Sequence, residues 1–367
     1  MSGIYGFKNL LEKSEEKEEK ILYDRKQPII LYAAGLMGTS VKSFLNKIGI
    51  SIKCFIDRNE SIANTSKEGI PVYLPESVPF EEREKSLVLI SFVKRPFEEI
   101  SNYLKHLGYQ SIMFAGDFCS SIFSGVEIAN IWWSGVFSHE EKENLLKSYE
   151  LFVDEESRNE YKQSLEWFTN HQNCKDSNIA ISKDERYFIP EVVKKLKKDG
   201  CFIDSAFVGG EYIKKVEQIT ENRFKKIYAF LLYPENEPGI LDKRINVYDE
   251  ELGNRNGQVK AKRIGLMGQY ADPSVRIIKN IKLDSIVEIA NINYIRFYSI
   301  SPVLPQIVGS QNILQKSRPI ITANIGHYRS DFINIPKLLY DNLPNYKIMF
   351  RSHNYYGNDS ILYAIPE

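Results

Sequence analysis

The sequence predicts an α/β protein with two tandem Rossmann-like parallel-sheet domains joined by a helical connector. The chain has 367 residues, a length that suits about two domains. Short apolar runs alternate with amphipathic helical stretches in two separate parts of the chain, which is typical of βαβ units. Between these parts lies a stretch with helical patterning only. We therefore expect an arm at 1–27, a first domain at 28–125, a connector at 126–185 and a second domain at 186–367.

The arm and the first domain follow from charge and periodicity. The charged run at 13–20 predicts a solvated helix, although Leu10 and Leu11 would let it pack on a neighbour. A helix is expected at 39–49 because one of its faces is apolar, at Val41, Phe44, Leu45 and Ile48. The other expected elements are strands at 29–35, 51–57, 86–92 and 111–116 and a helix at 96–108.

The connector and the second domain are interpreted in the same way. Apolar side chains are spread among charges over 139–168, which predicts helices that could also form a dimer surface. Helices of the second domain are expected at 190–200, 211–220 and 331–343. Its strands are expected at 201–207, 226–233, 244–252, 295–301, 319–325, 346–353 and 360–366.

Composition excludes several classes of protein. The 48 basic and 48 acidic residues give zero formal net charge, so no basic excess favours nucleic acid or an anionic membrane surface. No apolar run approaches the roughly 18 residues that a membrane-spanning helix needs. The four cysteines form no CxxC pair, which indicates reduced thiols in a cytoplasmic protein. With five histidines and no HxH or HExxH motif, no metal site is expected.

The segment AAGLMG at 33–38 is a candidate phosphate-binding turn between a strand and a helix. Gly35 and Gly38 would let a phosphate approach the backbone, and the helix N-terminus would supply free N–H groups. Asp57 ends the next strand, where an acid can accept hydrogen bonds from ribose hydroxyls. Ala33 replaces the first glycine of the usual GxGxxG pattern, so a tight turn without a ligand remains the alternative.

A resemblance adds to this interpretation. The segments YAAGLMG (32–38), CFIDRN (54–59) and GIPVYLPES (69–77) resemble the N-terminal Rossmann-like domain of bacterial sugar-modifying enzymes. These include acetyltransferases that act on nucleotide-linked amino sugars. The resemblance covers about 90 residues and implies a nucleotide or nucleotide-sugar site at Gly35, Gly38 and Asp57.

The segment FIDSAFVGGE at 202–211 is the candidate cofactor loop of the second domain. It reads as a buried strand that ends in an acid, then a turn of small residues, then a helix. Such a loop can hold a nucleoside cofactor, because glycine allows close approach and the acid can bind an amino group. The candidate residues are Asp204, Gly210 and Glu211, although many α/β proteins have a similar turn.

Several segments of the second half follow one another in a recognisable order and spacing: DEESRNEY (154–161), DERYF (184–188), FIDSAFVGGE (202–211), YAFLLYPEN (228–236), LDSI (283–286), GHYRSDFINIPKLL (326–339) and YKIMFRSHNYYGNDSILYAI (346–365). In this order and spacing, the chain from about residue 145 onward resembles the FkbM family of methyltransferases. Members of this family use S-adenosylmethionine, and many methylate hydroxyls of natural products or surface glycans. The resemblance thus implies this cofactor and a small-molecule or glycan substrate.

The chain departs from the family at its cofactor motifs. The first loop usually reads Asp-x-Gly-Ala-x-x-Gly, and here Asp204 and Gly210 are kept while the inner glycine is Ala206. The second strand usually ends in Phe-Glu-Pro, whose Glu holds the ribose, but Leu231 stands at that position. A ribose diol that meets leucine loses charge-assisted hydrogen bonds of about 1.5–3 kcal/mol each, which is roughly one to two decades of affinity.

A third family motif is replaced throughout. The family usually has Ile-Lys-x-Asp-x-Glu-Gly-Ala-Glu where this chain has 295–303. The three acids become Tyr298, Ile300 and Val303. The combined loss of these acids and of the ribose acid puts S-adenosylmethionine binding in doubt.

Four polar residues near the C-terminus form the candidate catalytic group: His327, Asp331, Arg351 and His353. Methylation of a hydroxyl needs a base near neutral pH, and His327 follows an expected strand where α/β sites open. Arg351 would suit an anionic substrate. The alternative is structural: His327 caps the helix that Asp331 opens, while Arg351 and His353 belong to a buried network.

Three functions stay open at this point. The first is a diverged S-adenosylmethionine-dependent methyltransferase acting on a glycan or small metabolite. The second is a catalytically inactive relative that serves as a structural or regulatory partner in a homo- or hetero-oligomer. The third is a protein that binds a nucleotide sugar through its first domain, around Gly35 and Asp57.

Overall fold

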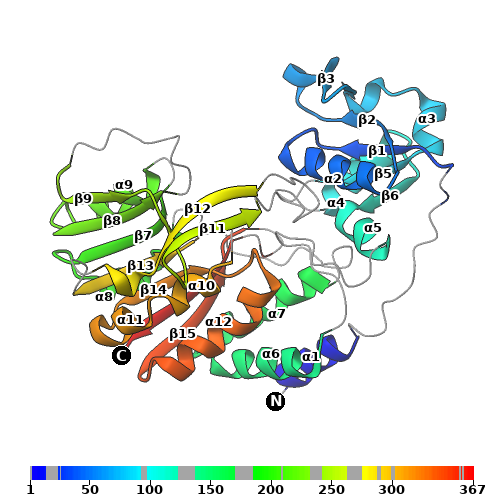
Figure 1. Ribbon diagram of the computed structural model, residues 1–367. Helices are drawn as coiled ribbons and strands as arrows, with labels where there is room; N and C mark the ends of the chain where they lie inside the picture. Colours follow the sequence, from blue (N-terminus) through cyan, green and yellow to red (C-terminus); the bar gives the residue numbers. More distant parts are fainter. Residues whose placement is uncertain are drawn as a thin grey trace.

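The protein contains two large sheets, each flanked by helices, in separate parts of the molecule (Figure 1). This computed structural model confirms the predicted α/β class with two mostly parallel sheets, whereas the boundaries of the predicted regions stay a prediction. It describes residues 2–13, 24, 26–91, 97–122, 137–169, 185–207, 210–231, 242–262, 275–286, 291–298, 302–354, 357 and 359–367.

The first sheet has six strands in the order β3-β4-β2-β1-β5-β6. Only the edge strand β3 is antiparallel to its neighbour. Both β1 and β5 are buried along their whole length, as expected of parallel strands covered on both faces. The strands are β1 Ile29–Tyr32, β2 Ile52–Ile56, β3 Thr65–Lys67, β4 Ile70–Tyr73, β5 Leu87–Ile90 and β6 Ser111–Phe114. The helices are α2 Leu36–Lys47, α3 Phe80–Lys85, α4 Phe97–His106 and α5 Ala115–Ile122, with 3₁₀ turns at Glu60–Ile62 and Pro75–Ser77.

The second sheet has seven strands in the order β15-β16-β14-β13-β7-β8-β9. The strands from β14 to β9 are parallel, and β16 runs antiparallel between β14 and β15. The strands are β7 Cys201–Phe207, β8 Lys226–Leu231, β9 Ile245–Tyr248, β13 Ile292–Phe297, β14 Ile320–Asn324, β15 Tyr346–Ser352 and β16 Ser360–Pro366. The accompanying helices are α8 Pro190–Lys195, α9 Glu211–Ile219, α10 Leu304–Val308, α11 Gln311–Ser317 and α12 Arg329–Asn342, with a 3₁₀ turn at Leu283–Ser285.

A third, three-stranded sheet lies beside the second one (Figure 1). Its strands are β10 Glu251–Leu252, β11 Gly257–Lys262 and β12 Val275–Ile281, with β11 and β12 paired antiparallel. The single strand predicted at 244–252 is therefore divided between β9 and β10, which belong to different sheets. β11 and β12 were not among the strands expected from the sequence.

Three more helices lie on the side of β15: α1 Ser2–Lys13, α6 His139–Leu151 and α7 Glu155–Thr169. α7 packs on β15 and α6 packs on α12. α1 lies against α6 and α7, and its Phe7 stacks on Tyr149 with ring centroids 4.5 Å apart (Figure 1). The predicted arm is thus helical over its described start and packed through Phe7 and Leu11 rather than fully solvated.

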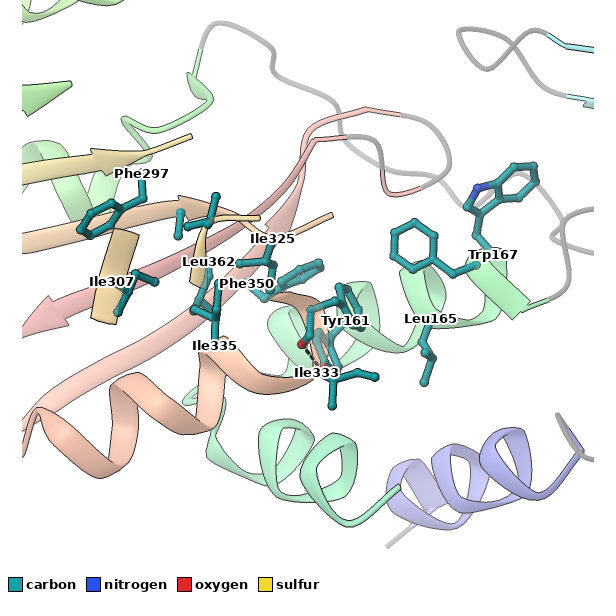
Figure 2. Close-up of a cluster of buried hydrophobic side chains, with 14 of the residues drawn as sticks. Tyr161, Leu165, Trp167, Phe297, Ile307, Ile325, Ile333, Ile335, Phe350 and Leu362 are labelled. Atoms are coloured by element: carbon teal, nitrogen blue, oxygen red, sulfur yellow. Dashed lines mark hydrogen bonds between the residues drawn. The ribbon is translucent and has the colours of Figure 1, made fainter. Parts of the chain in front are cut away.

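The largest core cluster includes many aromatic side chains (Figure 2). Tyr161 of α7 stacks on Phe332 of α12 at 4.2 Å, and its hydroxyl donates to the Phe332 carbonyl at 3.0 Å, so this buried tyrosine keeps its polar atom paired. At the far end of α7, Trp167 meets Phe114 of the first sheet edge-on at 5.4 Å. This ring pair joins the two halves of the molecule.

Among the described residues, no helix has the length and apolar character needed to cross a membrane.

Candidate functional site

The centre of the second sheet is the point where its strand order reverses. From β7 the chain continues through β8 and β9 to one side, and then returns to β13 on the other side. In open parallel sheets, ligands bind outside the carboxyl ends of the strands at such a point. Asp204 of β7 and Arg296 of β13 lie directly opposite each other there. The candidate site is therefore built around these two residues.

Asp204 and Arg296 form a buried ion pair. The Arg296 Nε and Nη2 atoms lie 2.9 and 2.7 Å from the same carboxylate oxygen, Oδ1 of Asp204. Nη2 also donates to the carbonyl of Ala206 at 2.7 Å. The Asp204 side chain has no exposed surface, and that of Arg296 is 11% exposed. Burial alone would lower the pKa of Arg296, but Asp204 and the neighbouring phenol groups raise it above its usual value.

Three tyrosine rings surround the Arg296 guanidinium. Its Cζ atom lies 5.0 Å from the ring centre of Tyr187, 4.6 Å from that of Tyr212 and 5.5 Å from that of Tyr298. These rings come from the turn before α8, from α9 and from the residue after β13. Tyr187 has a positive φ of 73°, and its carbonyl accepts a hydrogen bond from the Tyr294 hydroxyl at 3.0 Å. The site thus combines one carboxylate, one guanidinium and three aromatic faces.

Ser205 links the two central strands at their carboxyl ends. Its hydroxyl donates to the Tyr298 carbonyl at 2.9 Å and accepts from the Tyr298 N–H at 2.8 Å. The pairing of β7 with β8 is also irregular between Asp204 and Phe207, where β7 has one residue more than its partner. The chain's own groups therefore fill hydrogen-bonding positions at the strand reversal.

The other predicted cofactor residues flank this site. Gly210 precedes α9 and has a φ of 76°, a backbone conformation that favours glycine. Glu211 is the exposed first residue of that helix. Leu231 ends β8 and pairs with Phe207 through the backbone. Of the three residues that replace the family acids, Tyr298 and Val303 are described, and Ile300 lies outside the described residues.

His327 lies near the carboxyl end of β14 and faces the same edge. Its ring meets that of Tyr298 at 5.6 Å in an edge-on arrangement. The His327 side chain is partly buried. Burial lowers the pKa of His327, the Asp359 carboxylate partly offsets this effect, and Arg186 adds to it. A neutral imidazole at pH 7 follows, which is the form that can accept a proton.

Asp331 binds backbone groups outside its own helix. Its two carboxylate oxygens accept the N–H groups of Val303 at 2.7 Å and Leu304 at 3.1 Å. Its side chain is fully buried. The α12 helix begins at Arg329 after Tyr328, so Asp331 fixes the start of α10 instead of opening its own helix. This arrangement was not among the sequence-based alternatives.

Arg351 and His353 contact different elements. Arg351 donates to Ser157 at 2.6 Å and forms ion pairs with Asp154 at 3.2 Å and Glu156 at 2.9 Å, which ties β15 to α7. The Nε2 atom of His353 lies 2.6 Å from the Tyr363 hydroxyl of β16. Arg351 and His353 are thus held by different partners, and the catalytic roles of the four predicted residues stay predictions.

The candidate phosphate turn of the first domain is organised by its own side chains. Asp57 accepts the N–H groups of Ala34 at 2.9 Å and Asn59 at 3.0 Å. Ala33 has φ 81°, and a Cβ atom on Gly38 would lie 1.9 Å from the Ala33 carbonyl oxygen. Gly38 is therefore required by the turn itself. Asp57 holds an N–H that a phosphate would need, so nucleotide binding here stays a prediction without a further supporting observation.

Metal and disulfide sites are not seen in the described part of the chain. No cluster of three or more His, Cys, Asp or Glu side chains could hold a metal ion among those residues. Cys54, Cys119 and Cys201 are free thiols, and Cys174 lies outside the described residues.

Comparison with known proteins supports the fold. No protein-family model matches the chain, and no curated protein matches its sequence. Among solved structures, the chain is similar to a crystal structure of methyltransferase FkbM from Methylobacillus flagellatus KT. The two chains are 11% identical, the likeness covers 98% of each, and the TM-score is 0.70. At this identity the likeness shows the fold alone. It extends over both sheets, beyond the part where the sequence resembles the family.

The residues at the strand reversal do not suit S-adenosylmethionine. Asp204, the candidate acid for the cofactor's amino group, is paired with Arg296, which stands at the lysine position of the family motif. A sulfonium cofactor with an ammonium group would bring positive charge toward a buried guanidinium. Leu231 offers no carboxylate to the ribose. The missing ribose carboxylate is thus the difference from the family motif that is expected to weaken the binding of this cofactor.

Proposed function

We propose that this chain is a catalytically inactive, methyltransferase-like protein that acts as a structural or regulatory partner. The Arg296–Asp204 ion pair is the observation that carries the proposal. A cofactor ammonium that displaced Arg296 from Asp204 would break this pair, and breaking a buried ion pair costs about 3–5 kcal/mol. That cost corresponds to roughly two to three and a half decades of affinity.

Calorimetric titration with S-adenosylmethionine and S-adenosylhomocysteine tests this proposal. We expect no binding heat up to millimolar ligand. The Arg296→Ala variant serves as the comparison, because it removes the competing cation while Asp204 stays. Micromolar binding by the wild-type protein, together with methyl transfer to any hydroxyl acceptor, would overturn the proposal.

A diverged methyltransferase is the second candidate, and His327 favours it. A neutral imidazole beside Tyr298, at the edge where ligands of such sheets bind, suits a general base for a hydroxyl substrate. This candidate requires that the cofactor be held without Asp204. Cofactor binding that is equal in the wild-type protein and in Asp204→Asn would support it.

A further inference from the structure

We propose that Asp204 and the rings of Tyr187, Tyr212 and Tyr298 form a binding site for an organic cation, and that Arg296 of the same chain occupies it. A carboxylate flanked by aromatic faces is the environment that binds guanidinium and quaternary ammonium groups. The inference deepens the proposed function and rests on it, because both assume that Arg296 fills the position beside Asp204 where a ligand cation would bind.

The geometry supports an enclosed site. The guanidinium Cζ atom lies within 5.5 Å of all three ring centres, and these rings belong to three separate segments. Tyr187 and Tyr212 are buried, and Asp204 has no exposed surface. A cation held there is shielded from water, so its attraction to the rings and to the carboxylate is stronger than at an exposed position.

The pairing of Arg296 leaves one acceptor unused. The Nε and Nη2 atoms of Arg296 both bind Oδ1 of Asp204, while Oδ2 is buried and has no hydrogen-bond partner among the described residues. A free guanidinium can place two parallel N–H groups on the two oxygens of a carboxylate, whereas Arg296 is restricted by its attachment to β13. The site therefore has the chemistry to accept a small planar cation once the tethered one is removed.

Removal and replacement of the guanidinium tests the inference. Arg296→Ala should lower the midpoint of thermal unfolding because Asp204 is left buried without its counter-charge. Guanidinium chloride at 20 mM should restore at least half of this loss, whereas sodium chloride and urea at 20 mM should not. The expected restoration is a shift of about 3 °C, which requires that 20 mM guanidinium exceed its dissociation constant several-fold.

Arg244→Ala is a matched control. Arg244 also pairs with an acid, Asp242, at 2.6 Å and lies 4.0 Å from the ring of Phe224, but its side chain is 34% exposed. Its removal leaves no enclosed space, so guanidinium should not stabilise this variant. Equal stabilisation of the Arg244→Ala and Arg296→Ala variants would mean a general salt effect and would overturn the inference.

The double variant Asp204→Asn/Arg296→Ala removes both charges. It should fold without added cation, and guanidinium should not stabilise it, because the carboxylate is gone. If Arg296→Ala is insoluble on its own, its soluble yield with and without 20 mM guanidinium replaces the unfolding midpoint. If the double variant folds but guanidinium leaves the yield or unfolding midpoint of Arg296→Ala unchanged, the inference is wrong. Binding of S-adenosylmethionine and methyl transfer by the wild-type protein would instead refute the proposed function and would leave the guanidinium result standing.

Discussion

Glu160 is a carboxyl group whose ionisation the fold shifts into the neutral range. Burial raises the pKa of Glu160 from 4.5 to about 7, against the opposing effects of the Ser352 N–H and of Arg351, while Glu156 and Asp154 raise it further. The Ser352 N–H lies 2.6 Å from one of its oxygens. The folded state therefore binds more protons than the unfolded state between pH 4.5 and about 7. The contribution of Glu160 to the free energy of unfolding is fully present below pH 4.5 and is lost as the pH rises through about 7.

Glu160→Gln should therefore stabilise the protein at pH 8, by about 1–2 kcal/mol, and should have little effect at pH 5. Urea unfolding at the two pH values measures the difference. Glu251, whose pKa burial also raises to about 7, contributes a slope of the same sign. Glu160→Gln should thus reduce the pH dependence of the unfolding free energy only in part, because Glu251 still contributes. A stability that falls at both pH values would contradict the shifted ionisation of Glu160.

At the scale of elements, α1 is held by a few apolar contacts. Phe7 is fully buried and stacks on Tyr149, while Tyr5 on the same helix is 66% exposed. Phe7→Ala should cost about 3–4 kcal/mol of docking free energy and release α1. Hydrogen exchange of the amides in 2–13 reports this release. Tyr5→Ala is the matched control and should leave exchange unchanged; equal protection in both variants would mean that α1 is held by other contacts.

The sequence predicts some of these elements better than others. Buried parallel strands such as β1 and β5 are continuous apolar runs and β7 is an apolar run broken by two polar residues, and their alternation with amphipathic helices identifies both sheets. The β11 and β12 strands, GQVKAK and VRIIKNI, mix apolar and basic residues and lie in a small side sheet, so they lack the continuous apolar runs of the buried strands. The division between β9 and β10 depends on tertiary pairing, which a single run of residues does not reveal.

The site itself was only half predictable. Asp204 followed from the family pattern, but its partner Arg296 lies 92 residues away and becomes its neighbour through strand register alone. One signal was available: each is a charged residue within an otherwise apolar run, and buried charges are usually paired. The roles of Asp331 and Arg351 as structural links depend on which helices approach them, and sequence spacing does not contain that information.

At the scale of the whole molecule, Trp167 and Phe114 connect the two halves. Trp167 is 2% exposed, so Trp167→Ala should remove a large buried contact, of about 3–5 kcal/mol. We expect the two halves then to unfold separately, with an additional transition in scanning calorimetry. Tyr340→Ala, at a residue that is 50% exposed, should leave the calorimetric profile unchanged. A single, merely lowered transition in Trp167→Ala would show that other contacts couple the halves.

The docking of α1 on α6 also has a consequence for protein synthesis. α1 is synthesised before α6, and the stacking partner of its Phe7, Tyr149, follows about 140 residues later. At about 5–20 residues per second, translation leaves Phe7 and Leu11 without their partners for roughly 7–30 s. During that interval the first sheet has been synthesised in full. Nascent chains therefore present an uncovered apolar helix ahead of a completed domain, and a chaperone that binds short apolar segments would find it there.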